Sequence, residues 1–464
     1  MRPDENMNIP GSFRDPAGFI FYKDGRLYRQ VNNVYKENYD LMMGSGLYED
    51  LVNAGLMVSH EEATVAPAGP MTAYKIIRPE KIPFISYPYE WSFSQLKDAA
   101  LATLKIQKRA IGFGISLKDA SAYNIQFKGY SPILVDTLSF EKYREAEPWI
   151  AYRQFCQHFL TPLALMSLRD IRLGQLMRIY IDGIPLDLAS ALLPLSARFN
   201  MPLFLNIYLH AKSQKRFADK SVDRGRHKMS RLGLLGLIDN LESAVKGLKW
   251  NASGTEWADY YTKTNYTPEA LDFKKRIVAE FLGSTRPDSV WDFGANDGTF
   301  SRIAASAGAR IISFDIDPAC VEKNYLECVK NKDSGILPIL LDMANPSPAL
   351  GWAHEERMSL VSRGPAHTAM ALALIHHLAI GNNLPFGMIA DFFRKVCDFL
   401  IIEFVPKTDP QVERLLRCRE DVFPNYTQEF FESEFGRHFK ISNSVRIKDS
   451  GRQLYFMRRH ERTT

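Results

Sequence analysis

Residues 290–308, VWDFGANDGTFSRIAASAG, place an acid and closely spaced glycines at the end of an apolar run. Asp292, Gly294, Asn296 and Gly298 stand at every second position. Glycine at the end of a strand lets a ligand approach the backbone closely. A dinucleotide-binding turn reads G-x-G-x-x-G, whereas this turn has Asn in the middle and its last glycine one residue early. The spacing therefore favours a ligand other than a dinucleotide.

Two further acids stand where the next two strands are expected to end. Asp315 lies about 20 residues after the turn, where nucleotide-binding folds place the acid that holds both ribose hydroxyls. Asp317 is a near alternative, and Asp342 follows the apolar run GILPILL. Three acids at the carboxyl ends of consecutive parallel strands would lie along one edge of a sheet. The alternative is that they are strand-end caps in an unrelated α/β fold.

The turn resembles motif I of class I S-adenosylmethionine (SAM)-dependent methyltransferases, an acid-x-Gly-x-Gly/Asn-x-Gly pattern. The resemblance runs from Trp257 to the C-terminus and implies a Rossmann-like, seven-stranded methyltransferase sheet. SAM carries no phosphates, so it needs no diphosphate cradle. The implied reaction is direct in-line transfer of methyl from the sulfonium to a nucleophile, to which the enzyme contributes mostly positioning and desolvation.

The resemblance also implies which residues surround SAM. An acid attracts the methionine ammonium, directly or through water, and the small residues of the turn let the backbone pass beneath methionine and ribose. A second acid and its neighbour contact the ribose, and a third acid meets the adenine amino group. The acid for the ammonium is Asp292, and the small turn residues are Gly294, Asn296 and Gly298. Asp315 and Ile316 correspond to the ribose contacts, and Asp342 corresponds to the acid at the adenine amino group.

Catalytic candidates follow the fourth and fifth strands of the expected sheet. A strand is expected to run into ALALIHHLAIG, where adjacent His376 and His377 would point to opposite sides, so that only one faces the cleft. Such a histidine could be a general base for an oxygen or nitrogen nucleophile; alternatively, one ring is packed and the other orients a loop. Glu403 is a further cleft-facing polar candidate. The amino-methyltransferase signature (N/D)PP(Y/F) is absent, which disfavours adenine, cytosine or amide nitrogen as acceptor.

Three tyrosines precede the first helix of this half, in WADYYTKTNYT. In the family that it resembles, aromatic residues here often form a lid over SAM. Ring faces would attract the sulfonium by roughly 0.5–2 kcal/mol. The alternative is that Tyr260, Tyr261 and Tyr266 pack between domains.

The front half carries a second pattern. Asp119 and Asn124 have the D-x-x-x-x-N spacing of a kinase catalytic loop, and Asp136 follows an apolar run, as a metal-binding Asp does in that fold. The order resembles aminoglycoside-kinase-type domains, in degenerate form. No G-x-G-x-x-G covers the phosphates, and Arg29 or Lys23 would have to replace the phosphate-binding lysine. Alternatively, Asp119 and Asn124 only hold a loop through bonds to the backbone.

The elements that must position these residues are visible as periodic patterns. From residue 268 onward, helical and strand-like segments alternate, which predicts an α/β fold with a parallel sheet covered on both faces and a closing antiparallel pair. Upstream, residues 19–33 predict a hairpin, residues 93–110 an amphipathic helix, and residues 149–210 a mostly helical region.

Three segments are expected. Residues 1–210 form an N-terminal α+β, kinase-like accessory domain, residues 211–256 a basic linker with helices, and residues 257–464 the methyltransferase domain. Residues 212–231 contain eight Lys/Arg against two Asp, which indicates a solvated linker or, alternatively, a patch for phosphate-rich partners. The most apolar stretch, residues 188–209, is interrupted by polar residues and prolines and predicts a buried helical pair, not a membrane span.

Composition sets outer bounds. The chain has 464 residues, too many for one compact core, and a net charge of +5, which does not by itself imply nucleic acid. Its five cysteines form no CxxC pair and no cluster with metal-ligand spacing, so no bound metal is expected. The scattered cysteines are expected to be reduced thiols in a cytoplasmic protein. The first residues do not read as a signal peptide.

A kinase-like front half joined to a methyltransferase half is similar to the rhizobial host-specific nodulation proteins of NoeA type. That similarity implies a specialised metabolite or glycolipid as acceptor. The function expected is transfer of methyl from SAM to an unidentified O- or N-nucleophile. The alternatives are a phosphotransferase or bifunctional enzyme that uses Asp119, Asn124 and Asp136, and a non-catalytic SAM-binding regulator.

Overall fold

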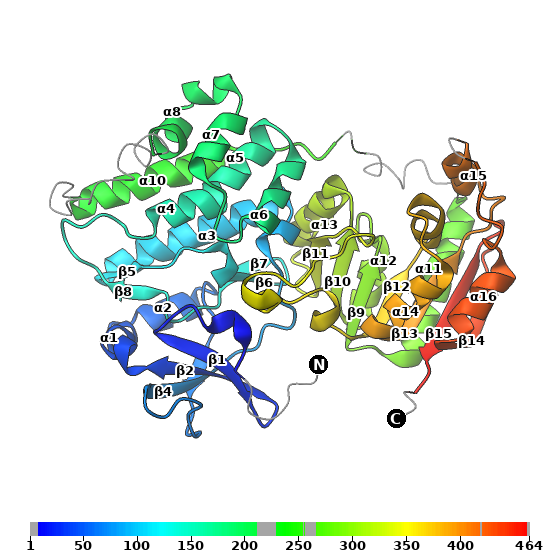
Figure 1. The fold of residues 1–464 in the computed structure, drawn as a ribbon, viewed down its shortest axis with the longest axis horizontal. Coiled ribbons are helices and arrows are strands. Elements are labelled where there is room, and N and C mark those ends of the chain that lie inside the picture. Colours follow the sequence, from blue (N-terminus) through cyan, green and yellow to red (C-terminus); the bar gives the residue numbers. More distant parts are fainter. Residues whose placement is uncertain (1–7, 211–228, 254, 256–265, 418–419, 462–464) are drawn as a thin grey trace. The chain divides into compact units, whose positions relative to one another are not determined.

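The computed structural model describes residues 8–210, 229–253, 255, 266–417 and 420–461. The chain divides into two compact units (Figure 1). The first unit comprises Met1–Asn251 together with Leu350–Arg357, and the second comprises Ala252–Ala349 together with Met358–Thr464.

The first unit begins with a four-stranded antiparallel sheet in the order β1-β2-β4-β3. The hairpin predicted over residues 19–33 is confirmed, because Asp24 and Gly25 between β1 and β2 have φ of 49° and 71°, as a tight hairpin turn requires. The strands are β1 (Gly18–Lys23), β2 (Arg26–Asn32), β3 (His60–Glu62) and β4 (Ala73–Pro79), with helices α1 (Lys36–Gly44) and α2 (Leu47–Asn53).

The predicted amphipathic helix over residues 93–110 is confirmed as α3 (Phe93–Gly112). Ser92 caps it, and Gln95 returns the bond, which fixes the first turn of the helix. Two small antiparallel pairs follow, β5 (Ile115–Leu117) with β8 (Phe140–Lys142), and β6 (Ile125–Lys128) with β7 (Ser131–Leu134). The remaining helices are α4 (Tyr152–Phe155), α5 (Thr161–Leu168), α6 (Leu176–Ile179), α7 (Leu186–Leu192), α8 (Met201–Leu203) and α10 (Arg231–Gly247).

The second unit is built on a seven-stranded sheet in the order β11-β10-β9-β12-β13-β15-β14. The first five strands are parallel, and β15 is antiparallel to both of its neighbours, so the predicted α/β sheet and the closing antiparallel pair are confirmed. The strands are β9 (Ser289–Phe293), β10 (Arg310–Asp315), β11 (Ile336–Leu340), β12 (Ala366–Ala371), β13 (Cys397–Phe404), β14 (Phe439–Arg446) and β15 (Gln453–Arg459).

Helices connect the parallel strands and lie along the sheet (Figure 1). Chain order reverses between β9 and β12, which is the point where open α/β sheets of this kind bind ligands at their carboxyl ends. The helices of the unit are α11 (Pro268–Thr285), α12 (Thr299–Ser306), α13 (Pro318–Asn331), α14 (Phe386–Val396), α15 (Pro410–Leu416) and α16 (Gln428–Gly436).

The apolar stretch 188–209 and the cysteines are placed as follows in the fold. Residues 188–209 are helical in part but not a fully buried pair, since several large apolar side chains there are exposed, Phe199 most of all. Within the described ranges, no helix combines the length and apolarity needed to cross a membrane. The cysteines at 156, 320, 328 and 397 are free and buried, and the described residues contain no His/Cys/Asp/Glu group suited to a metal ion.

Candidate functional site

The turn from β9 into α12 has the backbone shape that only small residues allow. Gly294, Asn296 and Gly298 have φ of 73°, 52° and 81°. The N–H groups of Gly294 and Ala295 donate to the carbonyl of Phe314, at 2.8 and 3.0 Å, which ties the turn to the neighbouring strand β10. A Cβ on Gly298 would lie 2.3 Å from Oδ1 of Asn324, so no larger residue fits there without a shift.

Asp315, at the end of β10, holds this turn in place. Its carboxylate accepts the backbone N–H of Asn296 at 2.8 Å and that of Asp317 at 2.9 Å. Burial raises the pKa of Asp315 to about 6, because the charged form is desolvated. Ile316, the next residue, is 56% exposed, which is unusual for isoleucine at a strand end. An apolar surface thus lies directly beside the acid.

Asp317, the near alternative to Asp315, has a different place. Its side chain accepts the N–H of Ala319 at 2.8 Å and caps α13. The carboxylate of Asp315 instead faces the glycine turn. Of the two acids, only Asp315 is bonded to the turn through its side chain.

Asp292 lies beneath the turn. It is 2% exposed, and its Oδ2 accepts the hydroxyl of Ser301 from α12 at 2.6 Å. Burial raises its pKa to about 7. Its carboxylate connects β9 to α12, and attraction of an ammonium by Asp292, directly or through water, stays a prediction.

Asp342 lies at the same edge of the sheet as Asp315. Asp315 pairs in register with Leu340 of β11, two residues before Asp342. Asp342 is partly exposed, and its Oδ1 accepts the N–H of Ala344 at 2.8 Å. Asp315 and Asp342 therefore lie at the carboxyl ends of adjacent strands, but only Asp342 is partly exposed, whereas Asp315 and Asp292 are buried.

The histidine pair differs from its expected conformation. Strand β12 ends at Ala371, and residues 375–381 are helical, so His376 and His377 do not alternate across a strand. Their ring centroids lie 4.1 Å apart. The Nδ1 of buried His376 has no hydrogen-bond partner, and burial lowers its pKa well below the usual value for histidine. Burial likewise lowers the pKa of His377 to about 4, so both rings are neutral near pH 7.

Glu403, expected to face the cleft, is instead fully buried near the end of β13. Its Oε2 accepts Lys274 Nζ at 2.6 Å and the N–H of Ala373 at 2.8 Å, and its Oε1 accepts Arg452 Nη1 at 3.4 Å. Although burial opposes ionisation, the two cations hold the pKa of Glu403 below its usual value. A carboxylate so occupied is a poor general base, and it serves instead to fix the loop that begins at Ala373.

Tyr266 joins the same network. Its hydroxyl donates to Glu403 and accepts from Arg452 Nη1 at 2.8 Å, and the Lys274 and Arg452 cations lie 4.9 and 4.7 Å from its ring centroid. The ring is therefore engaged by protein cations. The other two lid candidates, Tyr260 and Tyr261, lie outside the described residues.

Two buried cations of this network were not anticipated from sequence. Lys274 lies on the buried face of α11 with Ala270, Ile277 and Val278. A helical projection of the sequence shows this lysine on the apolar face, which is a signal of a buried charge. Arg452 precedes β15 and also binds Asp409 through Nε at 2.7 Å. No local pattern marks Arg452, because its partners are distant in sequence.

The kinase-like residues of the first unit do come together. Arg29 Nη1 lies 2.6 Å from Asp136 Oδ1, and both side chains are mostly buried. Asp136 Oδ2 accepts the hydroxyl of Ser139 at 2.8 Å, and Asn124 Nδ2 donates to the same hydroxyl at 3.2 Å. Asp119 accepts the N–H of Ser121 at 2.9 Å, and burial raises its pKa. The bond from Asp119 to the backbone is of the loop-holding kind that the alternative predicts.

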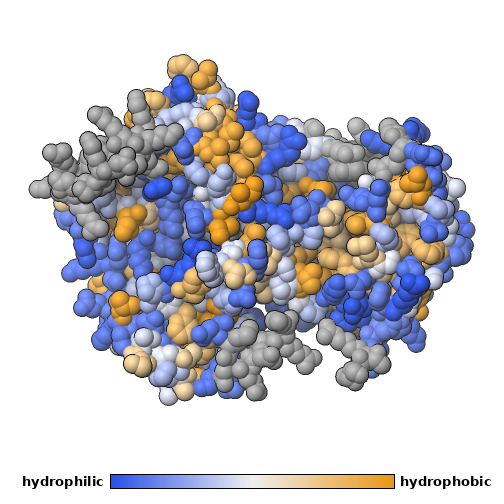
Figure 2. All heavy atoms as spheres, in the orientation of Figure 1, coloured by the Kyte–Doolittle hydropathy of each residue, from blue (hydrophilic) through white to orange (hydrophobic). Residues whose placement is uncertain are grey.

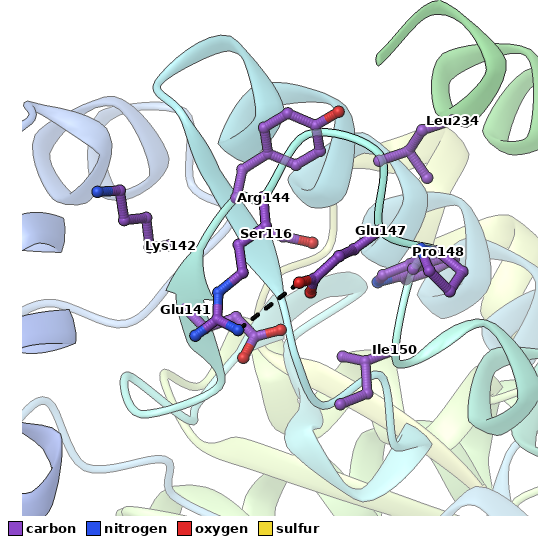
Figure 3. A pocket seen from close by; sticks show the side chains of 10 residues that line it. Ser116, Glu141, Lys142, Arg144, Glu147, Pro148, Ile150 and Leu234 are labelled. Atoms are coloured by element: carbon purple, nitrogen blue, oxygen red, sulfur yellow. Dashed lines mark ion pairs between the residues drawn. The ribbon is translucent and has the colours of Figure 1, made fainter. Parts of the chain in front are cut away.

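A small surface pocket lies elsewhere in the first unit (Figure 3). Arg144 and Glu147 face one another across it, with 3.7 Å between their closest charged atoms. None of the predicted site residues lines this pocket. Neither candidate site is therefore identified by it.

Comparison with known proteins finds one similar curated protein and several solved structures. No protein-family model matches the sequence. The chain is 35% identical over 461 residues to nodulation protein NoeA of Rhizobium meliloti (strain 1021), which covers 98% of this chain and 96% of that protein. The structure is similar to WbdD, described as a bifunctional kinase-methyltransferase, with a TM-score of 0.31 and 16% identity. This match covers 45% of this chain and 43% of the WbdD chain, so it spans less than half the length of WbdD.

It is also similar to the N-methyltransferase NodS of Bradyrhizobium japonicum WM9 in complex with S-adenosyl-L-homocysteine (SAH). That match has a TM-score of 0.32 and 13% identity, over 43% of this chain and 91% of that chain. Structural scores this low carry no weight, so family membership rests on the sequence relative alone.

Proposed function

This chain belongs to the family of nodulation protein NoeA, and on that premise we propose that its second unit is a SAM-dependent methyltransferase. The observation that carries the proposal is the turn from Gly294 to Gly298, held open at the switch point of the sheet by the carboxylate of Asp315. Three alternate turn positions have positive φ, and at two of them glycine leaves no side chain between the backbone and a ligand.

The residues around the turn fit an adenosyl ligand without phosphates. The carboxylate of Asp315 already accepts backbone N–H groups, and its remaining acceptor capacity is proposed to take a ribose hydroxyl. Ile316 offers an exposed apolar side chain against which a purine ring can pack. Asp342, on the next strand, accepts a single backbone N–H through Oδ1, which leaves acceptor capacity for the adenine amino group.

Bound SAM supplies a methyl group already activated by the sulfonium. The protein then has to hold the acceptor in line and keep water away. The loop after β12 is suited to this work, because Glu403 anchors the N–H of Ala373 at its start and Leu374 packs against Gly294. The loop is thus positioned by buried charges and touches the turn itself.

His376 is the proposed general base. Its neutral imidazole has an unpartnered Nδ1 within a buried setting, so it can accept a proton from an oxygen or nitrogen nucleophile without first losing one. His377 is the alternative on the same helical turn. We propose Glu403 as a positioning residue, because its oxygens are engaged by cations and a backbone N–H.

The acceptor is proposed to be a specialised metabolite or a glycolipid, in keeping with the relative's name as a nodulation protein. A second candidate function, phosphotransfer by the first unit, is favoured by the Arg29–Asp136 pair. In this proposal Arg29 would take the place of the lysine that holds phosphates in kinases, with Lys23 as the alternative, and Asp136 would be the metal-binding Asp.

Thermal denaturation with two ligands tests the methyltransferase proposal. SAH is expected to raise the Tm of the intact protein, whereas NAD is not, since the turn lacks a diphosphate cradle. Transfer of isotopically labelled methyl from SAM into lipid and water-soluble extracts then separates an enzyme from a SAM-binding regulator. Stabilisation by NAD and not by SAH would contradict the proposal.

A further inference from the structure

Four buried polar side chains form a hydrogen-bonded chain beneath the turn from Gly294 to Gly298. They are Asp292 of β9, Ser301 of α12, Ser313 of β10 and Asn324 of α13. Hydrophilic side chains cover much of the surface that Figure 2 shows, whereas each of these four is at most 2% exposed. A buried polar network holds its members in fixed positions when each of them is hydrogen-bonded.

The hydrogens of this chain all point toward Asp292 when its carboxylate is ionised. The hydroxyl of Ser301 donates its one hydrogen to Asp292 Oδ2, at 2.6 Å. The 3.1 Å bond between the hydroxyls of Ser301 and Ser313 must then take its hydrogen from Ser313. Asn324 Nδ2 in turn donates to Ser313 Oγ at 3.0 Å. Because each donor polarises the next, the chain favours the ionised, hydrogen-accepting form of Asp292.

The far end of the chain also supports the turn itself. The side chain of Asn324 lies against Gly298, where a Cβ would be 2.3 Å from Asn324 Oδ1 and 2.7 Å from Cγ. The near end of the chain is Asp292, on the strand that leads into the turn. One run of side chains therefore connects α13 to both ends of the turn.

We propose that Ser301, Ser313 and Asn324 are positioning residues for SAM, which hold the carboxylate of Asp292 ready to accept the ammonium of the methionine end. This inference rests on the proposed function of the second unit. Ser301 occupies one lone pair of Oδ2, so the carboxylate keeps acceptor capacity for the ammonium, directly or through water. The three positioning residues act through Asp292 and need not touch the ligand.

The charges around Asp292 determine what a pH experiment measures. Burial raises the pKa of Asp292 to about 7, the bonded hydroxyl lowers it, Asp315 of β10 raises it and Lys274 of α11 lowers it. Lys274 is itself paired with Glu403 and lies near Arg452. Asp315, with a pKa of about 6, titrates in the same range. The effect of Asp292 must therefore be separated from that of Asp315 by substitution.

Calorimetric titration with SAH from about pH 6 to about pH 8.5 tests the proposal. The wild type should bind SAH more weakly as the pH falls through about 7, because protonated Asp292 no longer attracts the ammonium. Ser301→Ala removes the direct donor and should move this loss of affinity to higher pH, with about tenfold weaker binding at about pH 7. Ser313→Ala and Asn324→Leu should move it in the same direction, by about threefold, since they remove donors further along the chain.

Two controls isolate the chain. Thr368→Val removes a fully buried hydroxyl from the neighbouring strand β12, outside the chain, and should leave the pH profile of the wild type in place. In Asp292→Asn, the pH dependence that remains belongs to Asp315. Adding Ser313→Ala to Asp292→Asn should therefore leave the pH profile of that variant unchanged.

The possible outcomes separate this inference from the proposed function. Failure of the wild type to bind SAH would overturn the methyltransferase proposal, and this inference with it. SAH binding that does not depend on pH, or that Ser301→Ala weakens equally at every pH, would overturn the inference alone. A shift of the pH profile in Thr368→Val as large as that in Ser301→Ala would do the same.

Discussion

The carboxylate of Asp315 accepts the backbone N–H of Asn296 at 2.8 Å, so the acid that ends β10 is bonded to the turn that ends β9. The same carboxylate accepts the N–H of Asp317. One side chain thereby fixes two loops at the carboxyl edge of the sheet. The ligand-facing shape of the turn depends on this acid as well as on the glycines.

Replacing Asp315→Asn should lower the free energy of unfolding by about 1–3 kcal/mol. An amide can accept only through its single oxygen, so one of the two buried N–H groups loses its partner. Urea denaturation of the intact protein measures the change. Asp288→Asn, at the exposed amino end of β9, is the matched control and should change stability by less than about 0.5 kcal/mol.

Asp292 should make the protein less stable as the pH rises from about 4 to about 7. Burial raises its pKa from 3.8 to about 7 in the folded protein, so in this window the folded state binds a proton that the unfolded state has lost. The contribution to the slope is at most about 1.4 kcal/mol per pH unit. Asp292→Asn removes the titration and should flatten the curve, as measured by chemical denaturation at several pH values. An unchanged slope would contradict the assigned pKa.

The Lys274–Glu403 pair should show strong coupling. Removing either partner, as in Lys274→Met or Glu403→Gln, leaves an uncompensated buried group and should cost about 3–5 kcal/mol. The double variant should cost much less than the sum of the single variants, because neither charge is then left alone. Denaturation of all four proteins in a double-mutant cycle measures this coupling. Additive losses would show that the two side chains act independently.

His376→Asn should abolish most methyl transfer while leaving SAH binding unchanged. Loss of a general base costs roughly 10²–10⁴-fold in rate. His377→Asn, on the same turn, is the comparison and should retain activity if His376 is the base. The pKa of His377 is about 4 and that of His376 is also lowered, so both rings are neutral from about pH 6 upward. Protonation of these histidines should therefore not reduce the rate of methyl transfer in this pH range. Labelled methyl incorporation into whichever extract the wild type labels provides the readout.

Mg-ATP should stabilise the first unit if that unit retains a nucleotide site. Asp136→Ala should then abolish the rise in Tm, since it removes the carboxylate that Arg29 faces. Lys142→Ala, a substitution on the exposed end of β8, serves as control and should leave the rise in place. The absence of any Mg-ATP effect on the wild type would leave Asp119 and Asn124 with the loop-holding role alone.

The alternation of helices and strands was enough to predict the sheet of the second unit. Buried runs such as SVWDF and ARIISFD are apolar on both faces, as parallel strands between helices must be, and their ends carry the acids. Local pattern decides such elements because each strand repeats the same signal. The positions of Asp315 and Asp342 at the edge of the sheet follow from it.

The sequence could not predict the conformation of the histidine pair or the surroundings of Glu403. LALIHHLAIG is an apolar run whose length suits a strand or a buried helix equally, so only tertiary packing decides between them. The partners of Glu403 lie far away in the chain, with Lys274 separated from it by 129 residues and Arg452 by 49. Burial of an ion network is a property of the fold, and no local spacing encodes it.

Calorimetric titration with SAH tests the central claim most directly. The account predicts single-site binding to the wild type and to Asp288→Ala. We predict loss of binding in Asp315→Ala, which removes the proposed ribose acceptor, and in Gly294→Arg, since a Cβ at this position would already lie 3.3 Å from Leu374 Cδ1. A folded wild-type protein that does not bind SAH, or a Gly294→Arg variant that binds it as well as the wild type, would contradict the account.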